Sequence, residues 1–285
     1  MSNENQRLPL KRALPSNRTY EQVLNHFNVE KRIAGKLRNT RSIEERKPIF
    51  ESMYKELFAQ VPDHPRLTRR NSADATAKSN RDKLRKVKRF IDHNTSFAEF
   101  APGDCRFSFE MCKHVKSVFA IDISDQMGPV DSVPVNFQLS LYDGRDLDLP
   151  DEIVDFVFSD QLIEHFHPDD TRSHFKLTHN ILKQGGFYAF QTPHKFRGPC
   201  DVSMYFCDEP EGFHLKEWTF AEIVELLRDV GYSSWRGYWT AKGITVRLPM
   251  TYFYAMETIL KLFPPAPRRA LSKFALPMLM MVAVK

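Results

Sequence analysis

Two short apolar segments on either side of a proline-glycine turn constrain the fold of this chain more than any other feature. Residues 96–101 (SFAEFA) have the composition of a buried strand, which Pro102-Gly103 ends. Apolar residues at helical intervals follow, and a second apolar strand, 117–122, ends in Asp122. A strand, a glycine turn, a helix and a strand ending in a carboxylate form one half-unit of a doubly wound α/β sheet.

The glycine turn alone is a weak signal, because only Gly103 is present, and later segments strengthen it. Tyr142-Asp143-Gly144 precedes a polar loop. Residues 155–165 (DFVFSDQLIEH) continue from a strand into a helix, and residues 181–190 (ILKQGGFYAF) combine a helix end with a further strand. Together these segments predict an alternating series of strands and helices.

This order and spacing resembles that of the class I S-adenosylmethionine-dependent methyltransferases, especially the bacterial group that acts on small molecules and sugars. The resemblance covers residues 96–240 and the terminal strand, and it hardly touches the first 80 residues. It implies a mostly parallel, seven-stranded sheet of order 3-2-1-4-5-7-6 with the last strand antiparallel. It also implies S-adenosyl-L-methionine as cofactor and S-adenosyl-L-homocysteine as product.

The resemblance assigns cofactor contacts to the expected carboxyl ends of the strands. Asp122 would hold the ribose hydroxyls, Glu99 the methionine ammonium, and Asp143 would lie near the adenine amino group. Ser159 and Asp160 would face the methionine part and the transferred methyl group. The full set of predicted cofactor residues is Glu99, Phe100, Ala101, Gly103, Asp104, Asp122, Ile123, Asp143, Gly144, Ser159 and Gln161.

A hydroxyl acceptor benefits from a general base, and His165, His194 and Asp160 are the predicted catalytic residues. His167 is a further candidate. Each histidine also has a structural interpretation: His165 can brace the helix after strand four, and His194 can line the pocket. His214 is expected, with Glu217, to order a loop.

Metal and thiolate chemistry are not predicted. The segment 165–170 (HFHPDD) resembles a metal-ligand cluster, but a helix start accounts for its aspartates. Cys105 lies in the cofactor turn without an acid–base partner. The four cysteines have no CxxC spacing, so neither a zinc site nor a disulfide framework is indicated.

Charge is unevenly distributed. Residues 1–90 hold 22 Lys/Arg and 10 Asp/Glu, whereas the rest of the chain holds 19 and 26. The basic segment 66–90 is either a lid with Leu84, Val87 and Phe90 as its packing face, which we favour, or the phosphate-binding arm of an RNA methyltransferase. A catalytically silent protein with this fold is a third interpretation. DNA adenine methylation is disfavoured, because no aromatic clamp follows Asp160.

The predicted organisation is a flexible N-terminus (1–19), a basic helical appendage (20–92) and a methyltransferase domain (93–285) with insertions at 195–216 and 245–275. Helix 168–183 is expected to have an Asp N-cap and to end at Gly185-Gly186. Further strands are expected at 135–139, 153–159, 187–192, 232–240 and 277–284.

The expected acceptor is a hydroxyl or amine of a small or sugar-containing metabolite, such as a cell-surface glycan precursor or a secondary metabolite. No apolar run is long enough for a membrane span, so the sequence predicts a cytoplasmic protein. Nucleic-acid binding is not favoured, and peripheral membrane contact and the oligomeric state are left open.

Overall fold

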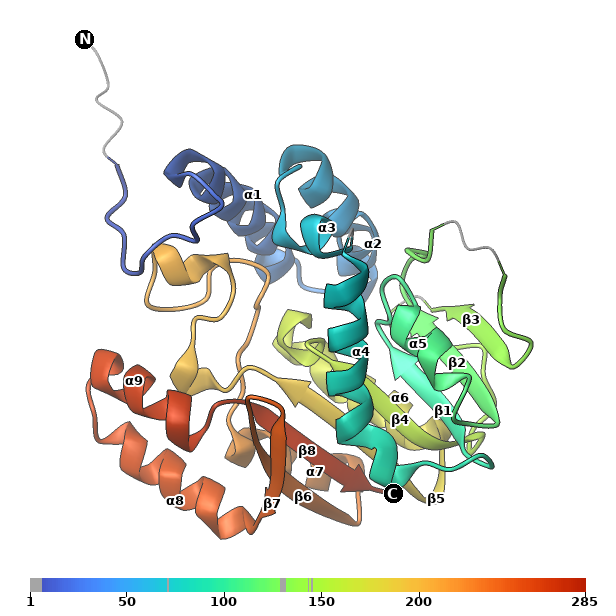
Figure 1. Ribbon diagram of the computed structural model, residues 1–285. Helices are drawn as coiled ribbons and strands as arrows, with labels where there is room; N and C mark the ends of the chain where they lie inside the picture. Colours follow the sequence, from blue (N-terminus) through green and yellow to red (C-terminus); the bar gives the residue numbers. More distant parts are fainter. Residues whose placement is uncertain (1–6, 71, 129–131, 143, 145) are drawn as a thin grey trace.

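The computed structural model describes residues 7–70, 72–128, 132–142, 144 and 146–285 (Figure 1). Its described strands form one eight-stranded sheet of order β3-β2-β1-β4-β5-β8-β6-β7. They are Ser96–Phe100 (β1), Ser117–Asp122 (β2), Phe137–Leu141 (β3), Val154–Asp160 (β4), Leu182–Thr192 (β5), Ser234–Ala241 (β6), Ile244–Leu248 (β7) and Leu279–Val284 (β8).

Strands β1 to β5 are parallel, and β8 inserts antiparallel between β5 and β6. The predicted mostly parallel α/β sheet is therefore confirmed, with the last strand antiparallel. The eighth strand, β7, pairs antiparallel with β6 at the sheet edge, where the sequence predicted only an insertion. A two-residue turn at Lys242-Gly243 joins the pair, and both turn residues have positive φ, as a tight hairpin requires.

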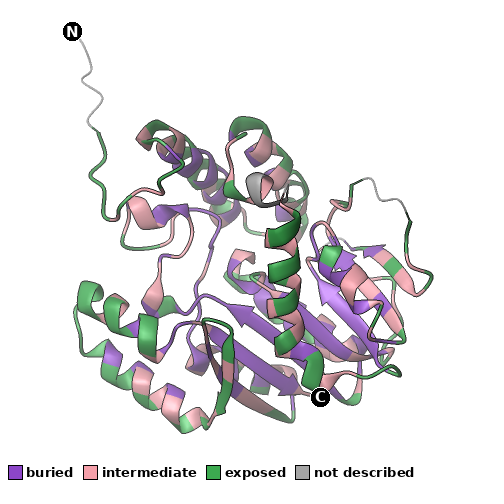
Figure 2. Cartoon of the chain, viewed as in Figure 1, coloured by how far each residue is buried: buried purple, intermediate pink, exposed green. Residues whose placement is uncertain are grey.

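The central strands are apolar on both faces, and helices cover each face. The described helices are Tyr20–Asn39 (α1), Ile43–Gln60 (α2), Pro65–Arg70 (α3), Ala73–Val87 (α4), Arg106–Met111 (α5), Pro168–Ile181 (α6), Phe220–Val230 (α7), Met250–Lys261 (α8) and Pro265–Ala275 (α9). Figure 2 shows the central strands as the most deeply buried part of the chain. No helix in the described part is long and apolar enough to cross a membrane.

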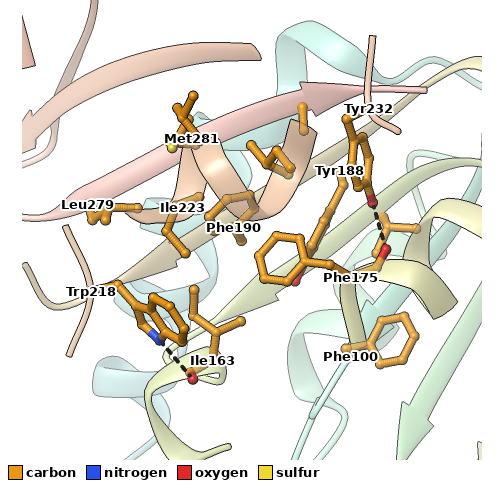
Figure 3. Close-up of a cluster of buried hydrophobic side chains, with 14 of the residues drawn as sticks. Phe100, Ile163, Phe175, Tyr188, Phe190, Trp218, Ile223, Tyr232, Leu279 and Met281 are labelled. Carbon is orange, nitrogen blue, oxygen red and sulfur yellow. Dashed lines mark hydrogen bonds between the residues drawn. The ribbon is translucent and has the colours of Figure 1, made fainter. Parts of the chain in front are cut away.

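Successive side chains of a strand point to opposite faces, so each strand contributes to two cores. Phe175 of α6 and Ile223 of α7 pack against Tyr188 and Phe190 on one face (Figure 3). On the other face, Val87 of α4 belongs to a cluster that also contains Phe97, Phe107, Phe156 and Phe158. Helix α4 runs along this second face in Figure 1.

The N-terminal helices α1 and α2 form a third apolar cluster, and it includes Phe213 and Leu215 of the long loop after β5. Helix α1 starts with a capping box between Thr19 and Gln22. Figure 1 shows α1, α2 and α3 together at one end of the molecule, with α4 leading from them along the sheet. The basic appendage and the long loop therefore share one core.

Two predicted helix boundaries were wrong. The N-cap of α6 is His167, whose Nδ1 accepts from the backbone N–H of Asp169, and not an aspartate. Asp170 instead forms a buried ion pair with Arg46 of α2. Gly185 and Gly186 lie inside β5, because extended backbone starts directly after α6 at Leu182. A Cβ at Gly186 would lie 2.8 Å from the carbonyl oxygen of Lys183, so this kinked strand requires glycine there.

Candidate active site

The turn after β1 has an unusual run of left-handed backbone conformations. Ala101, Gly103 and Cys105 have φ values of 53°, 61° and 57°. Non-glycine residues adopt this conformation at a cost of roughly 1–2 kcal/mol each, and such strain is concentrated at functional sites. The turn is tied to β2, because the N–H of Ala101 donates to the carbonyl of Ile121 over 2.8 Å.

Asp122 lies at the end of β2, directly beside this turn, and is 5% exposed. Its Oδ1 accepts from the backbone N–H of Ile123 (2.8 Å) and of Ser124 (3.3 Å), and its Oδ2 accepts from that of Gly103 (3.3 Å). Burial raises the pKa of Asp122, while these backbone donors oppose the shift. An ionised carboxylate can accept about four hydrogen bonds, so capacity remains for a ligand hydroxyl.

Glu99 of β1 is 1% exposed and has donors on both carboxylate oxygens. The hydroxyl of Ser108 donates to Oε2 over 2.6 Å, and the ammonium of Lys83 lies 3.3 Å from Oε1. Lys83 Nζ is also 3.9 Å from Oδ2 of Asp160 at the end of β4. Burial lowers the pKa of Lys83, but the charges of Glu99 and Asp160 outweigh it and raise that pKa.

The alternation of the strands explains this contact. Glu99 follows Phe97, and Asp160 follows Phe158, with one residue between in each strand, so both carboxylates share the sheet face that α4 covers. Lys83 of α4 therefore places an ammonium where the sequence predicted that Glu99 meets a ligand ammonium. The basic run 66–90 did not reveal this, because charged runs usually lie in solvent.

After β4 the chain turns through Gln161 (φ 58°), whose N–H donates to the carbonyl of Gln191. It then forms a 3-10 turn, Ile163–His165, and Trp218 Nε1 donates to the carbonyl of Ile163 from the core side (Figure 3). This turn places Glu164 in a fully buried position.

Glu164 is 0% exposed, and its Oε2 accepts from the hydroxyl of Thr192 over 2.9 Å. Its Oε1 has no hydrogen-bond partner among the described residues. Burial raises the pKa of Glu164 to about 7. An unpaired buried carboxylate oxygen is costly, so it marks a place where a partner is missing.

The imidazole rings of His165 and His214 lie edge to face next to Glu164, with ring centroids 5.1 Å apart. Nδ1 of His165 is 2.9 Å from the carbonyl oxygen of Phe213, and Nδ1 of His214 is 2.8 Å from Oε1 of Glu217. Burial lowers the pKa of His165 to about 3. Burial also lowers that of His214, but the hydrogen bond to Glu217 and the charge of Glu164 outweigh it and raise the pKa to about 9.

The N-terminal helices hold the loop that carries His214. Arg38 of α1 donates to four loop carbonyls over 3.0–3.2 Å, those of Pro210, Glu211, Gly212 and His214. The guanidinium of Arg66 in α3 lies 4.9 Å from the ring centroid of Tyr54. The charge of Arg66 opposes the rise that burial causes in the pKa of Asp122, and it adds to the lowering that burial causes in the pKa of His165. One cation therefore acts on both parts of the site.

Two predicted site residues lie away from this arrangement. His194 is 0% exposed and has both ring nitrogens in hydrogen bonds, to Glu257 over 2.9 Å and from the N–H of Phe196 over 3.1 Å. This is a structural position, and we do not retain His194 as a base. Ser159 faces the opposite side of the sheet, where its hydroxyl lies 2.8 Å from that of Tyr188.

The other residues predicted to bind the cofactor lie in or next to the turn after β1, or follow β3 in the sequence. Phe100 is buried against Tyr142 and His174, and Asp104 Oδ1 accepts from the N–H of Arg106. The remaining ones are Gly144, which has a φ of 88°, and Asp143, which lies outside the described residues. Burial raises the pKa of Cys105 to about 12, so its side chain is a thiol at neutral pH.

Sequence reasoning missed Lys83, Glu164 and Arg66 as members of the site, and it treated His214 as a loop-ordering residue. Glu164 adjoins the predicted His165, and that adjacency is the one local signal among them. His214 joins the cluster only through tertiary structure.

Comparisons with known proteins agree with this geometry. Residues 98–190, which contain the turn after β1, Asp122 and the end of β4, match a family model described as a methyltransferase domain. This part of the chain therefore carries a methyltransferase domain. No curated protein matches the sequence.

Two solved structures with TM-scores above 0.5 share the fold of this chain, and a third has a lower score. Phosphoethanolamine N-methyltransferase 1 of Haemonchus contortus, in complex with phosphoethanolamine and S-adenosylhomocysteine, is 15% identical with a TM-score of 0.51, over 72% of this chain and 43% of that chain. A proposed O-methyltransferase of Nostoc punctiforme is 13% identical with a TM-score of 0.51, over 93% and 69%. A SAM-dependent methyltransferase of Archaeoglobus fulgidus is 15% identical with a TM-score of 0.47, over 74% and 94%.

Proposed function

We propose that this methyltransferase acts on a hydroxyl or amine of a small or sugar-containing metabolite. The acceptor would bind beside Asp160, Glu164 and His165, under α2, α3 and the loop that carries His214. The observation that supports this most is that α1 and α2, together with the loop that carries His214, cover this end of the sheet. Arg38 of α1 donates to the carbonyl of His214, and Phe213 and Leu215 of the loop share an apolar core with α1 and α2. A site covered in this way would admit a small acceptor more readily than a macromolecule.

The cofactor site would use the residues around the turn after β1. Asp122 retains acceptor capacity for the ribose, and Gly103 lets the backbone approach the ligand closely. Glu99 and Asp160 form the anionic patch that suits the methionine ammonium, and Lys83 occupies that patch in the structure. When bound, the cofactor supplies an activated methyl group on its sulfonium.

The chain's own task is then to align the acceptor and to exclude water. The cover formed by Tyr54 and Arg66 lies over the side of the site where His165 is found. The RNA alternative assigns phosphate contacts to the arm 66–90, and Lys83 of that arm is directed toward Glu99 with only 20% of its side chain exposed. This favours the small acceptor.

The test is to incubate the protein and methyl-labelled S-adenosylmethionine with a cell extract, and to separate small molecules from RNA. We expect label in a small-molecule fraction, and none with Asp122→Ala. Label confined to RNA, or equal labelling by both proteins, would overturn the proposal. Calorimetry with S-adenosylhomocysteine confirms separately that the parent protein binds cofactor.

A further inference from the structure

The cluster of Glu164, His165 and His214 has the composition and geometry of a metal site. One ligand-type atom from each residue can be chosen so that all three lie within 4.8 Å of one another. The unpartnered Oε1 of fully buried Glu164 is an independent sign that this cluster lacks a ligand. Two imidazoles and one carboxylate are a donor set that zinc and related transition metals prefer.

The contacts around the cluster orient each donor. Because Nδ1 of His165 faces a carbonyl oxygen, that nitrogen carries the proton, and Nε2 of His165 keeps a lone pair for a metal. Nδ1 of His214 donates to the carboxylate of Glu217, so Nε2 of His214 is the nitrogen that a metal would bind, with release of its proton. The hydroxyl of Thr192 donates to Oε2 of Glu164, so Oε1 is left to bind a metal. Supporting contacts of this kind, carboxylate to histidine and carbonyl to histidine, accompany metal-binding histidines in general.

Glu217, which orients His214, is itself fixed. Its Oε1 also accepts from the N–H of Cys200 over 2.7 Å, and a Cβ at Gly198 would lie 1.6 Å from its Oε2. Only glycine at position 198 allows this carboxylate to approach. The support for His214 is therefore built into the loop.

We propose that Glu164, His165 and His214 bind one divalent transition-metal ion of the zinc type through Oε1 of the glutamate and Nε2 of both histidines. In a tetrahedral zinc site with bonds of about 2.0–2.1 Å, donor atoms lie about 3.3 Å apart. One ligand-type atom of each residue already lies within 4.8 Å of the others, so metal binding would require side-chain rotations and no backbone rearrangement. Three protein ligands leave a coordination position open, as in catalytic zinc sites.

A second cluster of the same composition, His26, Glu30 and His64, shows what a purely structural arrangement looks like. The guanidinium of Arg18 can only donate, so Nδ1 of His26 accepts from it and Nε2 donates to Glu30 over 2.8 Å. The other oxygen of Glu30 accepts from the N–H of Phe213. His26 has no lone pair left and lies beside a cation, which makes it a matched control.

A metal at Glu164 would lie on the acceptor side and would lower the pKa of a hydroxyl bound at its open position. This consequence rests on the proposed function, whereas the metal site itself does not. The two are tested by different measurements, metal content for the site and labelled product for the function.

The experiment uses the full chain, stripped with a chelator and given one equivalent of Zn²⁺, with bound zinc measured by elemental mass spectrometry after gel filtration. We expect about one zinc per chain in the parent and in His26→Gln. Glu164→Gln and His214→Ala should weaken zinc binding at least about tenfold, and Glu217→Gln by about 10–100-fold. Co²⁺ added to the parent should give a ligand-field absorption band that these variants lack.

Retention of zinc in all three site variants would overturn the proposal, and so would its loss in His26→Gln alone or its absence from the parent. Binding of S-adenosylhomocysteine and circular dichroism show that each variant is folded. Because Glu164→Gln conserves side-chain shape, it stays informative if His214→Ala fails to fold.

Discussion

Glu99 and Glu164 are both buried glutamates at the same end of the sheet, and the protein satisfies them in different ways. Glu99 has the ammonium of Lys83 on one oxygen and the hydroxyl of Ser108 on the other. Glu164 has one neutral donor, Thr192, and one oxygen without a partner among the described residues. The chain itself neutralises Glu99, so removal of Lys83 would leave a buried charge unpaired, whereas we propose an external partner for the incomplete Glu164.

The largest expected effect comes from removing the partner of Glu99. Lys83→Met should lower the free energy of unfolding by about 2–4 kcal/mol, because it leaves Glu99 and Asp160 close together without their cation. S-adenosylhomocysteine, which supplies an ammonium of its own, should then stabilise the variant more than the parent. Thermal unfolding with and without this ligand measures both. An unchanged melting temperature would show that the ion pair does not form.

Asp122 extends the comparison to a third buried carboxylate, one satisfied by backbone N–H groups. Asp122→Ala should weaken binding of S-adenosylhomocysteine by roughly 10–150-fold, or about 1.5–3 kcal/mol, because charge-assisted hydrogen bonds to the ribose are lost. Asp122→Asn keeps one acceptor oxygen and should lose less. Calorimetry that gives the parent affinity for Asp122→Ala would remove this residue from the cofactor site.

Glu164→Gln tests the other side of the comparison. In metal-free protein it should change the free energy of unfolding by no more than about 1 kcal/mol, because the direct hydrogen bond to the carboxylate comes from the neutral hydroxyl of Thr192. The matched change Glu99→Gln should cost more, since it leaves Lys83 with only Asp160. Urea unfolding of both variants after chelator treatment makes the comparison. Equal losses would mean that the two glutamates are satisfied alike.

The smallest effect is expected from two lysines of the basic segment, half-buried Lys86 and exposed Lys88. Lys86→Ala combined with Lys88→Ala should leave stability and cofactor affinity within about 0.5 kcal/mol of the parent, because surface charges contribute little. Retention on immobilised RNA at near-physiological salt should be negligible for parent and variant. Strong retention by the parent, lost in the double variant, would instead support the RNA alternative.

The turn after β1 and its place beside Asp122 could be predicted from sequence because their determinants are local. Gly103 and Asp122 are separated by 19 residues, and strand alternation with a glycine turn is enough to place them. The boundaries that failed had competing local chemistry. Gly185-Gly186 is typical of a helix end, but Leu182 already pairs with Val154 of β4, and both glycines form backbone hydrogen bonds with Lys285, directly after β8.

The acceptor side could not be derived in this way. No pattern in the sequence connects Glu164 with His214, because a loop fixed by Arg38 brings them together. His194 was an attractive candidate since it follows the end of β5, but proximity to a strand end does not reveal that Glu257, 63 residues later, occupies its ring nitrogen. Lys83 was concealed in a basic run whose other members lie mostly at the surface.

The contacts of Arg38 also determine which part of the site can form first while the chain is being synthesised on the ribosome. The contacts between Arg38 and the loop span 172 to 176 residues, whereas the contact between Gly103 and Asp122 spans 19. Contacts between distant residues form late, because both partners must be synthesised and a long loop must close. The nascent chain can therefore shape the turn near Asp122 while His214 is still untranslated. The proposed acceptor site is completed only after that histidine has emerged.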